Sequence, residues 1–247
     1  MKCSQCGVEN PDESRFCKDC GAQLKIAMGD TGAAFVRAFH HEMEGDPAAA
    51  LEEFKRLLQA KPRSVEVTYR LGRAHLALGQ IENAIDCFRS VVERQPKFAY
   101  AHLRLADCYY DKCQMDLAIQ SYRNALAANP HCLPAMLGLG RALMHMAHMG
   151  EAIGVFKTAV ERSPDCTIAH YYLGLMYKGE RMLEEAIAAF EKVAEQNPND
   201  ASSHYHLGTL FRRKRMRDVA IGEFMRAVQL DPNDKASLEE LQQLQVM

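Results

Sequence analysis

The chain has 247 residues, and its 30 Lys and Arg against 32 Asp and Glu give a formal net charge of −2. A chain so close to neutral argues against a polyanionic partner such as nucleic acid. No apolar run approaches the roughly 20 residues that a membrane-spanning helix needs. We therefore expect a soluble protein with no nucleic-acid partner and no membrane insertion.

The first two dozen residues contain two identically spaced cysteine pairs. Each pair has the form Cys-x-x-Cys-Gly, and ten residues separate the two pairs. The predicted metal ligands are Cys3, Cys6, Cys17 and Cys20. Four thiolates complete a tetrahedral shell, which suits zinc best and leaves no position open for a substrate. The sequence therefore predicts a structural metal site and not a catalytic one.

Residues 1–24 resemble a small zinc ribbon, and this resemblance implies Zn²⁺ as the cofactor. Iron also accepts four thiolates, so zinc and iron both stay open at this point. A disulfide-bonded secreted module is the alternative, but no signal-peptide pattern precedes the cysteines. A segment this short buries too little surface to fold unaided, and metal binding would supply the missing free energy. Thiolate ligation favours a reducing compartment, so we expect a cytoplasmic protein.

Beyond a linker expected at residues 25–33, the chain repeats with a period of 34 residues. A proline recurs at this interval six times, at Pro62, Pro96, Pro130, Pro164, Pro198 and Pro232. Setting each proline as the thirty-second residue of a unit gives the units 31–64, 65–98, 99–132, 133–166, 167–200 and 201–234. This period is typical of helix–turn–helix repeats, in which a proline cannot continue a helix.

Three further positions of the unit are restricted in kind. In all six units the twentieth residue is alanine, the eighth is glycine or alanine, and the twenty-fourth is aromatic. The aromatic residues are Phe54, Phe88, Tyr122, Phe156, Phe190 and Phe224. Small residues let two antiparallel helices approach closely, and the aromatic ring fills the space beside them. Helices of about 14 residues are marginal alone in water, so stacking between neighbouring units should stabilise them.

This pattern resembles the tetratricopeptide repeat (TPR) family over about five-sixths of the chain. The resemblance implies an all-α fold, a right-handed superhelical solenoid of six helix–turn–helix units within residues 34–247. A capping helix at 235–246 would close it. Two departures are visible: the chain has no tryptophan, although the family carries one near the start of each unit, and the first unit has Arg37 where leucine is expected.

The resemblance also places one row of side chains, from the first helix of each unit, on a concave surface. The row is rich in tyrosine, aliphatic and basic residues. The predicted binding residues are Tyr69, Arg73, Tyr100, Leu103, Asp107, Tyr110, Leu137, Arg141, Met144, Tyr171, Leu175, Lys178, Tyr205 and Arg212, and Leu76 and Ile168 complete the row. Tyr, Met and Arg are enriched at protein interfaces. We expect this groove to bind a peptide or amphipathic helix that carries apolar and acidic residues.

Two smaller predictions concern the ends of helices. Asp200 and Asp234 stand where their side chains would cap the helices that follow. His145 and His148 are three residues apart in a Met-rich stretch. We expect a turn between two helices there, and not a metal site, because no third ligand is evident.

No catalytic signature is present: there is no glycine-rich phosphate loop with lysine, no nucleophile elbow and no His-Glu-x-x-His. The sequence therefore favours a non-catalytic protein–protein interaction adaptor or scaffold, with the ribbon as a second contact module. A self-assembling structural scaffold, which would be a homo-oligomer, and a zinc- or redox-responsive regulatory protein remain the alternatives.

Overall fold

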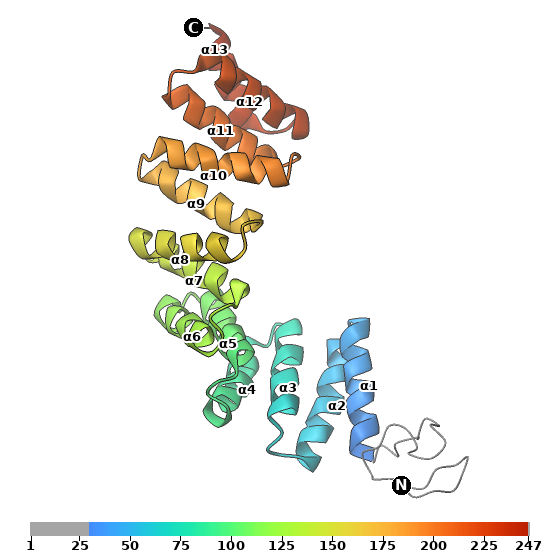
Figure 1. The fold of residues 1–247 in the computed structure, drawn as a ribbon. Coiled ribbons are helices and arrows are strands. Elements are labelled where there is room, and N and C mark those ends of the chain that lie inside the picture. Colours follow the sequence, from blue (N-terminus) through green and yellow to red (C-terminus); the bar gives the residue numbers. More distant parts are fainter. Residues whose placement is uncertain (1–29, 247) are drawn as a thin grey trace, which may run out of the picture. The chain divides into compact units, whose positions relative to one another are not determined.

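The computed structural model describes residues 30–246, and all regular secondary structure in this range is helical (Figure 1). The chain divides into two compact parts, residues 1–95 and residues 96–247. The predicted ribbon, with its four cysteines, lies outside the described residues. Among residues 30–246, no helix combines the length and the apolar character that crossing a membrane requires.

The first part contains two antiparallel helix pairs within its described residues. Its helices are α1 (Asp30–Glu44), α2 (Pro47–Ala60), α3 (Val65–Ala77) and α4 (Ile81–Arg94). Helix α1 starts inside the stretch expected as a linker, so residues 30–33 are helical. Glycines suggested a linker there, but one glycine costs a helix only about 1 kcal/mol. Packing of Phe35 and the buried Ala38 in the core that α1 shares with α2 offsets this cost.

The second part contains four antiparallel pairs and a closing helix. These are α5 (Ala99–Asp111), α6 (Met115–Ala128), α7 (Leu133–His145), α8 (Met149–Arg162), α9 (Thr167–Gly179), α10 (Leu183–Gln196), α11 (Ala201–Arg213), α12 (Arg217–Leu230) and α13 (Lys235–Val246). Each of these helices packs on the next one along the chain. Helix α13 occupies the range predicted for the capping helix, and its Leu244 is buried in a core with Ala220 and Phe224.

The core of each pair is built around the close approach predicted from the eighth and twenty-fourth positions. All six aromatic residues at the twenty-fourth position are buried. A Cβ atom added at Gly140 would lie 2.4 Å from the Phe156 ring, and one added at Gly72 would lie 2.7 Å from the Phe88 ring. Real Cβ atoms do not come this close, so in these two units a larger residue at the eighth position would force the aromatic ring to shift.

The turn inside each helix pair depends on a left-handed backbone at the fifteenth position of the unit. The first two units place glycine there, Gly45 and Gly79, with φ of 77° and 71°. The other four units hold ordinary residues in the same conformation, namely Cys113, Ala147, Arg181 and Arg215. A left-handed backbone costs a residue with a Cβ roughly 1–2 kcal/mol. The packed helices on either side must therefore impose this turn on the last four units.

The helix ends confirm the two predicted aspartate caps and the turn predicted near His145 and His148. Asp200 accepts a hydrogen bond of 2.9 Å from the Ser203 amide, and Asp234 accepts one from the backbone of α13. His145 ends α7, and His148 lies in the turn before α8. Within the part of the chain that the structure describes, no three His, Cys, Asp or Glu side chains gather where they could hold a metal ion.

Candidate functional site

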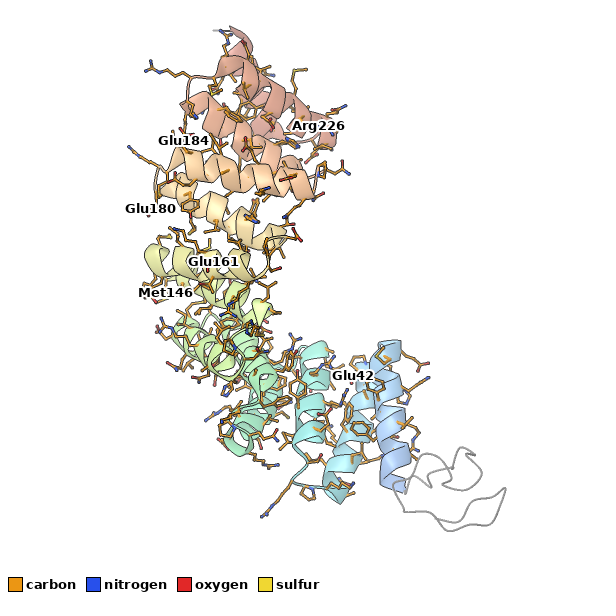
Figure 2. All side chains as sticks on the ribbon, in the orientation of Figure 1. Glu42, Met146, Glu161, Glu180, Glu184 and Arg226 are labelled. Atoms are coloured by element: carbon orange, nitrogen blue, oxygen red, sulfur yellow. The ribbon has the colours of Figure 1, made fainter. Side chains whose placement is uncertain are left out.

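In the first part, the two predicted groove residues on α3 already have partners. The Arg73 guanidinium lies 3.0 Å from the carboxylate of Glu42 on α1 (labelled in Figure 2), and Arg70 approaches the same carboxylate at 2.8 Å. The Tyr69 ring packs at 5.7 Å from the Phe88 ring, measured between centroids. The positive charge of Arg73 is therefore balanced from within the chain.

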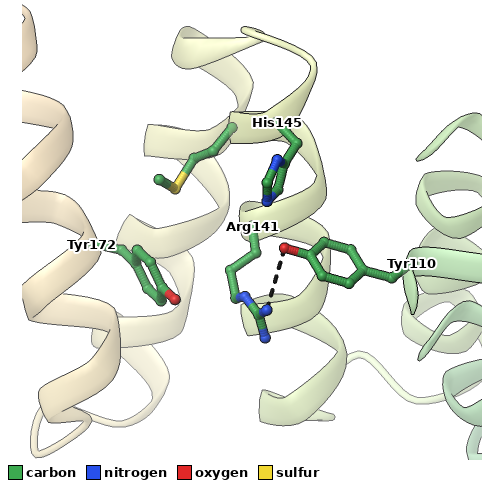
Figure 3. Close-up of a pocket in the computed structure, with 5 residues that line it drawn as sticks. Tyr110, Arg141, His145 and Tyr172 are labelled. Atoms are coloured by element: carbon green, nitrogen blue, oxygen red, sulfur yellow. Dashed lines mark hydrogen bonds between the residues drawn. The ribbon is translucent and has the colours of Figure 1, made fainter. Parts of the chain in front are cut away.

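In the second part, Arg141 lies in a pocket of about 280 Å³ lined by α5, α7 and α9 (Figure 3). Tyr110 and Tyr172 stand on opposite sides of its guanidinium. That group donates a hydrogen bond of 3.2 Å to the Tyr110 hydroxyl and lies 4.7 Å from the ring centroid, within the range of a cation–π contact. Among residues 30–246, Arg141 makes no ion pair with a carboxylate. Its charge is therefore available to a ligand.

A second and larger pocket, of about 510 Å³, shares Arg141 and Tyr172 with the first. Its apolar lining includes Leu137 on α7, Ile168 and Tyr171 on α9, and Val193 on α10. The Ile168 side chain is 55 % exposed although it is fully apolar. The two pockets form one surface, which we call the Arg141 groove, defined by Tyr110, Leu137, Arg141, Ile168, Tyr171 and Tyr172.

Lys178 on α9 belongs to a neighbouring aromatic cluster. Its Nζ lies 3.1 Å from Nδ1 of His206 and 5.7 Å from the centroid of the Tyr205 ring. Burial, with the Lys178 charge beside it, lowers the pKa of His206 to about 4. His206 is therefore neutral at pH 7, and its Nδ1 accepts a hydrogen bond from the lysine. Burial, together with Arg213, also lowers the pKa of Lys178.

Three predicted groove residues are engaged inside the second part. Leu103 is 4 % exposed and belongs to the core, so the expectation that it lines the groove is wrong. Leu137 at the same position of the next unit keeps accessible surface, so the side chains supplied by the adjacent helices, and not the helix position, bury Leu103. Asp107 accepts a hydrogen bond from Tyr122 and pairs with Arg104, and Arg212 pairs with Glu240 of α13.

The other predicted residues keep accessible surface. Tyr100 is 54 % exposed, and the half-buried members are Met144, Leu175 and Tyr205. Sequence reasoning did not select Tyr172 and His206, which both stand at the sixth position of their units. In chain order the six units carry Val, Arg, Arg, Gly, Tyr and His at this position. Because no residue type is shared across the units, the sequence pattern did not mark this position as part of a site.

The stacked helix pairs, their period and the groove along their first helices together define a tetratricopeptide repeat protein. Models of this repeat match residues 167–200 and 137–182, and a zinc-ribbon domain model matches residues 2–24. The chain belongs to the family described as the cilia and flagella-associated protein 70 C-terminal domain, whose model matches residues 22–154, more than half of the chain. None of these matching models describes an enzyme family.

Solved structures with the same fold include several TPR proteins. YrrB, described as a TPR protein with an unusual peptide-binding site, is 23 % identical with a TM-score of 0.69, over 77 % of this chain and 98 % of YrrB. MamA is 25 % identical with a TM-score of 0.63, over 67 % and 96 %. The C-terminal part of a TPR protein from Cytophaga hutchinsonii is 16 % identical with a TM-score of 0.73, over 87 % and 89 %. The search of curated proteins finds no match.

Proposed function

We propose that this protein is a non-catalytic adaptor or scaffold whose Arg141 groove binds a peptide or helix of a partner protein. The partner segment carries an acidic side chain for Arg141 and an apolar side chain for the pocket of Leu137, Ile168 and Tyr171. The observation that carries this proposal is the Arg141 guanidinium, which lies between two tyrosines and has no carboxylate partner among the described residues. Arg and Tyr in such partly desolvated pockets dominate the binding energy of many interfaces.

A comparison between two arginines supports the choice of this region. Arg73 and Arg141 both stand at the ninth position of their units. Glu42 balances the charge of Arg73 at 3.0 Å, whereas Arg141 contacts the hydroxyl and ring of Tyr110 and pairs with no carboxylate among residues 30–246. An acidic ligand would have to displace Glu42 at Arg73 but would displace no described carboxylate from Arg141. We therefore assign binding to the groove in the second part and not to the whole predicted row.

The fold itself is compatible with this function. The YrrB structure shares the fold and is described as having a peptide-binding site. The ribbon would add a second contact module. Its donor set fits zinc, because four cysteines in two Cys-x-x-Cys pairs match the composition and spacing of structural zinc sites. Bound zinc would hold the ribbon folded and would take no part in a reaction.

A displayed peptide library tests the proposal before the partner protein is identified. Wild-type protein should enrich peptides that place an acidic residue close to an aliphatic or aromatic one. Arg141→Glu should weaken these peptides by roughly tenfold or more, because it places a negative charge opposite the acidic side chain of the peptide, and such like-charge contacts are unfavourable. Arg226→Glu is the matched control, since Arg226 on α12 is exposed and lines neither pocket (labelled in Figure 2).

Two results would count against the proposal. Enriched peptides without acidic residues would remove the role of Arg141, and equal loss in both variants would show a nonspecific charge effect. Light scattering on the same samples separates the alternative function. If the molar mass of the particles rises with protein concentration and no peptides are enriched, a self-assembling scaffold would be favoured over an adaptor.

A further inference from the structure

Helix α1 carries an apolar stripe that stays largely exposed within residues 30–246, although the Arg70 guanidinium of α3 lies 5.1 Å from the centroid of the Phe39 ring. Val36, Phe39 and Met43 are 49 %, 42 % and 72 % exposed. Their spacing of three and four residues places them on one face of the helix. The neighbouring side of the helix, with Phe35 and Ala38, packs in the core that α1 shares with α2. The stripe, defined by these three exposed residues, is therefore an additional apolar face of the first helix.

In later units, the residues at equivalent positions show which part of the protein packs against this face. Val36 stands at the sixth position of its unit, and Tyr172 and His206, at the same position of two later units, contact the unit before them. Tyr172 stacks on Phe156 with ring centroids 5.1 Å apart, and His206 lies 4.7 Å from Phe190. The exposed stripe therefore lies where a preceding unit of the stack would pack.

Residues 1–29 precede the stripe but do not continue the repeat. Extending the 34-residue register backwards places Phe16 at the alanine position, Cys20 at the aromatic position and Met28 at the proline position. These residues break all three rules of the unit. The segment nevertheless contains apolar residues that could contact the stripe, namely Val8 and Phe16 between the two cysteine pairs.

The ribbon is also tethered within reach of the stripe. Five residues, 25–29, separate the matched ribbon from the start of α1, and five extended residues span at most about 18 Å. Met43 lies thirteen residues into α1, or roughly 20 Å along the helix axis at 1.5 Å per residue. A tether this short holds the ribbon at an effective concentration of order millimolar near α1, so even a small apolar contact would be populated.

We propose that the zinc ribbon, residues 1–24, docks on the stripe of Val36, Phe39 and Met43 and closes this end of the stack in place of a preceding repeat. The last repeat of the second part already packs against a non-repeat helix, since α13 buries Leu244 against Ala220 and Phe224. Docking gives the ribbon a structural role as an end cap that is independent of peptide binding in the Arg141 groove.

Photo-crosslinking in the full-length, metal-loaded protein tests this contact. A benzophenone amino acid replaces Met43, and mass spectrometry maps the crosslinked peptides after illumination. The expected product is an intrachain crosslink to residues 1–24, and a further Val36→Glu substitution should reduce its yield several-fold. Circular dichroism confirms that Val36→Glu keeps its helices, as expected for an exposed site.

The matched control places the same benzophenone at Arg56 on α2. The Arg56 side chain is 70 % exposed, and α2 runs antiparallel to α1, with Glu53 beside Arg37, so this site lies near the tethered end of the ribbon. A freely swinging ribbon would label both sites equally, which would overturn the proposal. Crosslinks from residue 43 to a second chain, or to no part of residues 1–24, would overturn it as well.

Discussion

The hydroxyl group of Tyr122 on α6 donates a hydrogen bond of 2.8 Å to the carboxylate of Asp107 on α5. Tyr122 is the single tyrosine among the six aromatic residues at the twenty-fourth position. Its ring also reaches the next unit, because a Cβ atom added at Gly138 would lie 2.4 Å from it. This side chain therefore joins two units of the second part, as Phe156 and Phe190 do through Tyr172 and His206 of the following units. Its hydroxyl adds a hydrogen bond that a phenylalanine cannot make.

Replacing Tyr122 by phenylalanine removes this hydrogen bond but keeps the ring. We expect the free energy of unfolding of the second part to fall by about 1 kcal/mol, the usual net value of one hydrogen bond. Urea unfolding, monitored by circular dichroism, measures this change in the free energy of unfolding. Tyr177→Phe is the control, because Tyr177 is buried but its hydroxyl makes no hydrogen bond within residues 30–246. Equal effects of the two substitutions would show that the Tyr122–Asp107 bond contributes nothing specific.

Two glycines of the same unit should respond in opposite directions to alanine. Gly140→Ala places a Cβ atom 2.4 Å from Phe156 and should destabilise the protein by roughly 1–3 kcal/mol through overpacking. Gly154 lies inside α8 with no atom within 4 Å of its added Cβ. Gly154→Ala should therefore stabilise the helix by up to about 1 kcal/mol. The urea concentrations at the unfolding midpoints of both variants, compared with wild type, measure these changes in stability. A Gly140→Ala protein as stable as wild type would contradict the close packing of the Phe156 ring on Gly140.

The stability of the second part should fall as the pH drops from about 6.5 towards 4. Burial and Lys178 lower the pKa of His206 to about 4, while an unfolded histidine titrates near 6.5. Between these values the unfolded chain binds a proton that the folded chain does not, so acid favours unfolding. His206→Gln should flatten this dependence, measured as urea midpoints from pH 7.5 to 4.5. An unchanged slope would mean that other groups cause it.

Metal removal should affect the ribbon without unfolding the helices. Elemental analysis of the purified protein should find zinc, and Cys17→Ser should lose it, because three thiolates no longer complete the tetrahedral shell. The far-ultraviolet helical signal should persist, since the helix cores lie within residues 30–246. Cys113→Ser is the control and should retain its zinc, as Cys113 lies in an exposed turn far along the chain. Iron in place of zinc, or loss of helicity, would contradict this expectation.

The sequence predicted the helix pairs well because the repeat rules are local and are repeated six times. The sequence pattern could not predict which of two residues at the same position of the unit would be paired or buried, because their neighbours in the fold differ. Arg73 and Arg141 have the same place in the unit, and only the first meets a carboxylate, from Glu42, thirty-one residues earlier. Leu103 and Leu137 also share a position, yet only Leu103 is buried. Such differences depend on which side chains the adjacent helices supply.

The left-handed turn was hidden for a related reason. Glycine at Gly45 and Gly79 is the usual signal of a positive φ, but Ala147 and Arg215 adopt the same conformation without it. Packing of the two flanking helices imposes the positive φ at this position, and no residue type in the sequence predicts it.

Within each part, every helix packs chiefly on its neighbours along the chain, and this has a consequence for how such a protein changes over generations. Internal duplication or loss of one whole unit would leave every remaining helix with a partner of the same kind. The length of the proposed binding surface could therefore vary in steps of one unit, while a shorter insertion would shift the register and disrupt the contacts on both sides.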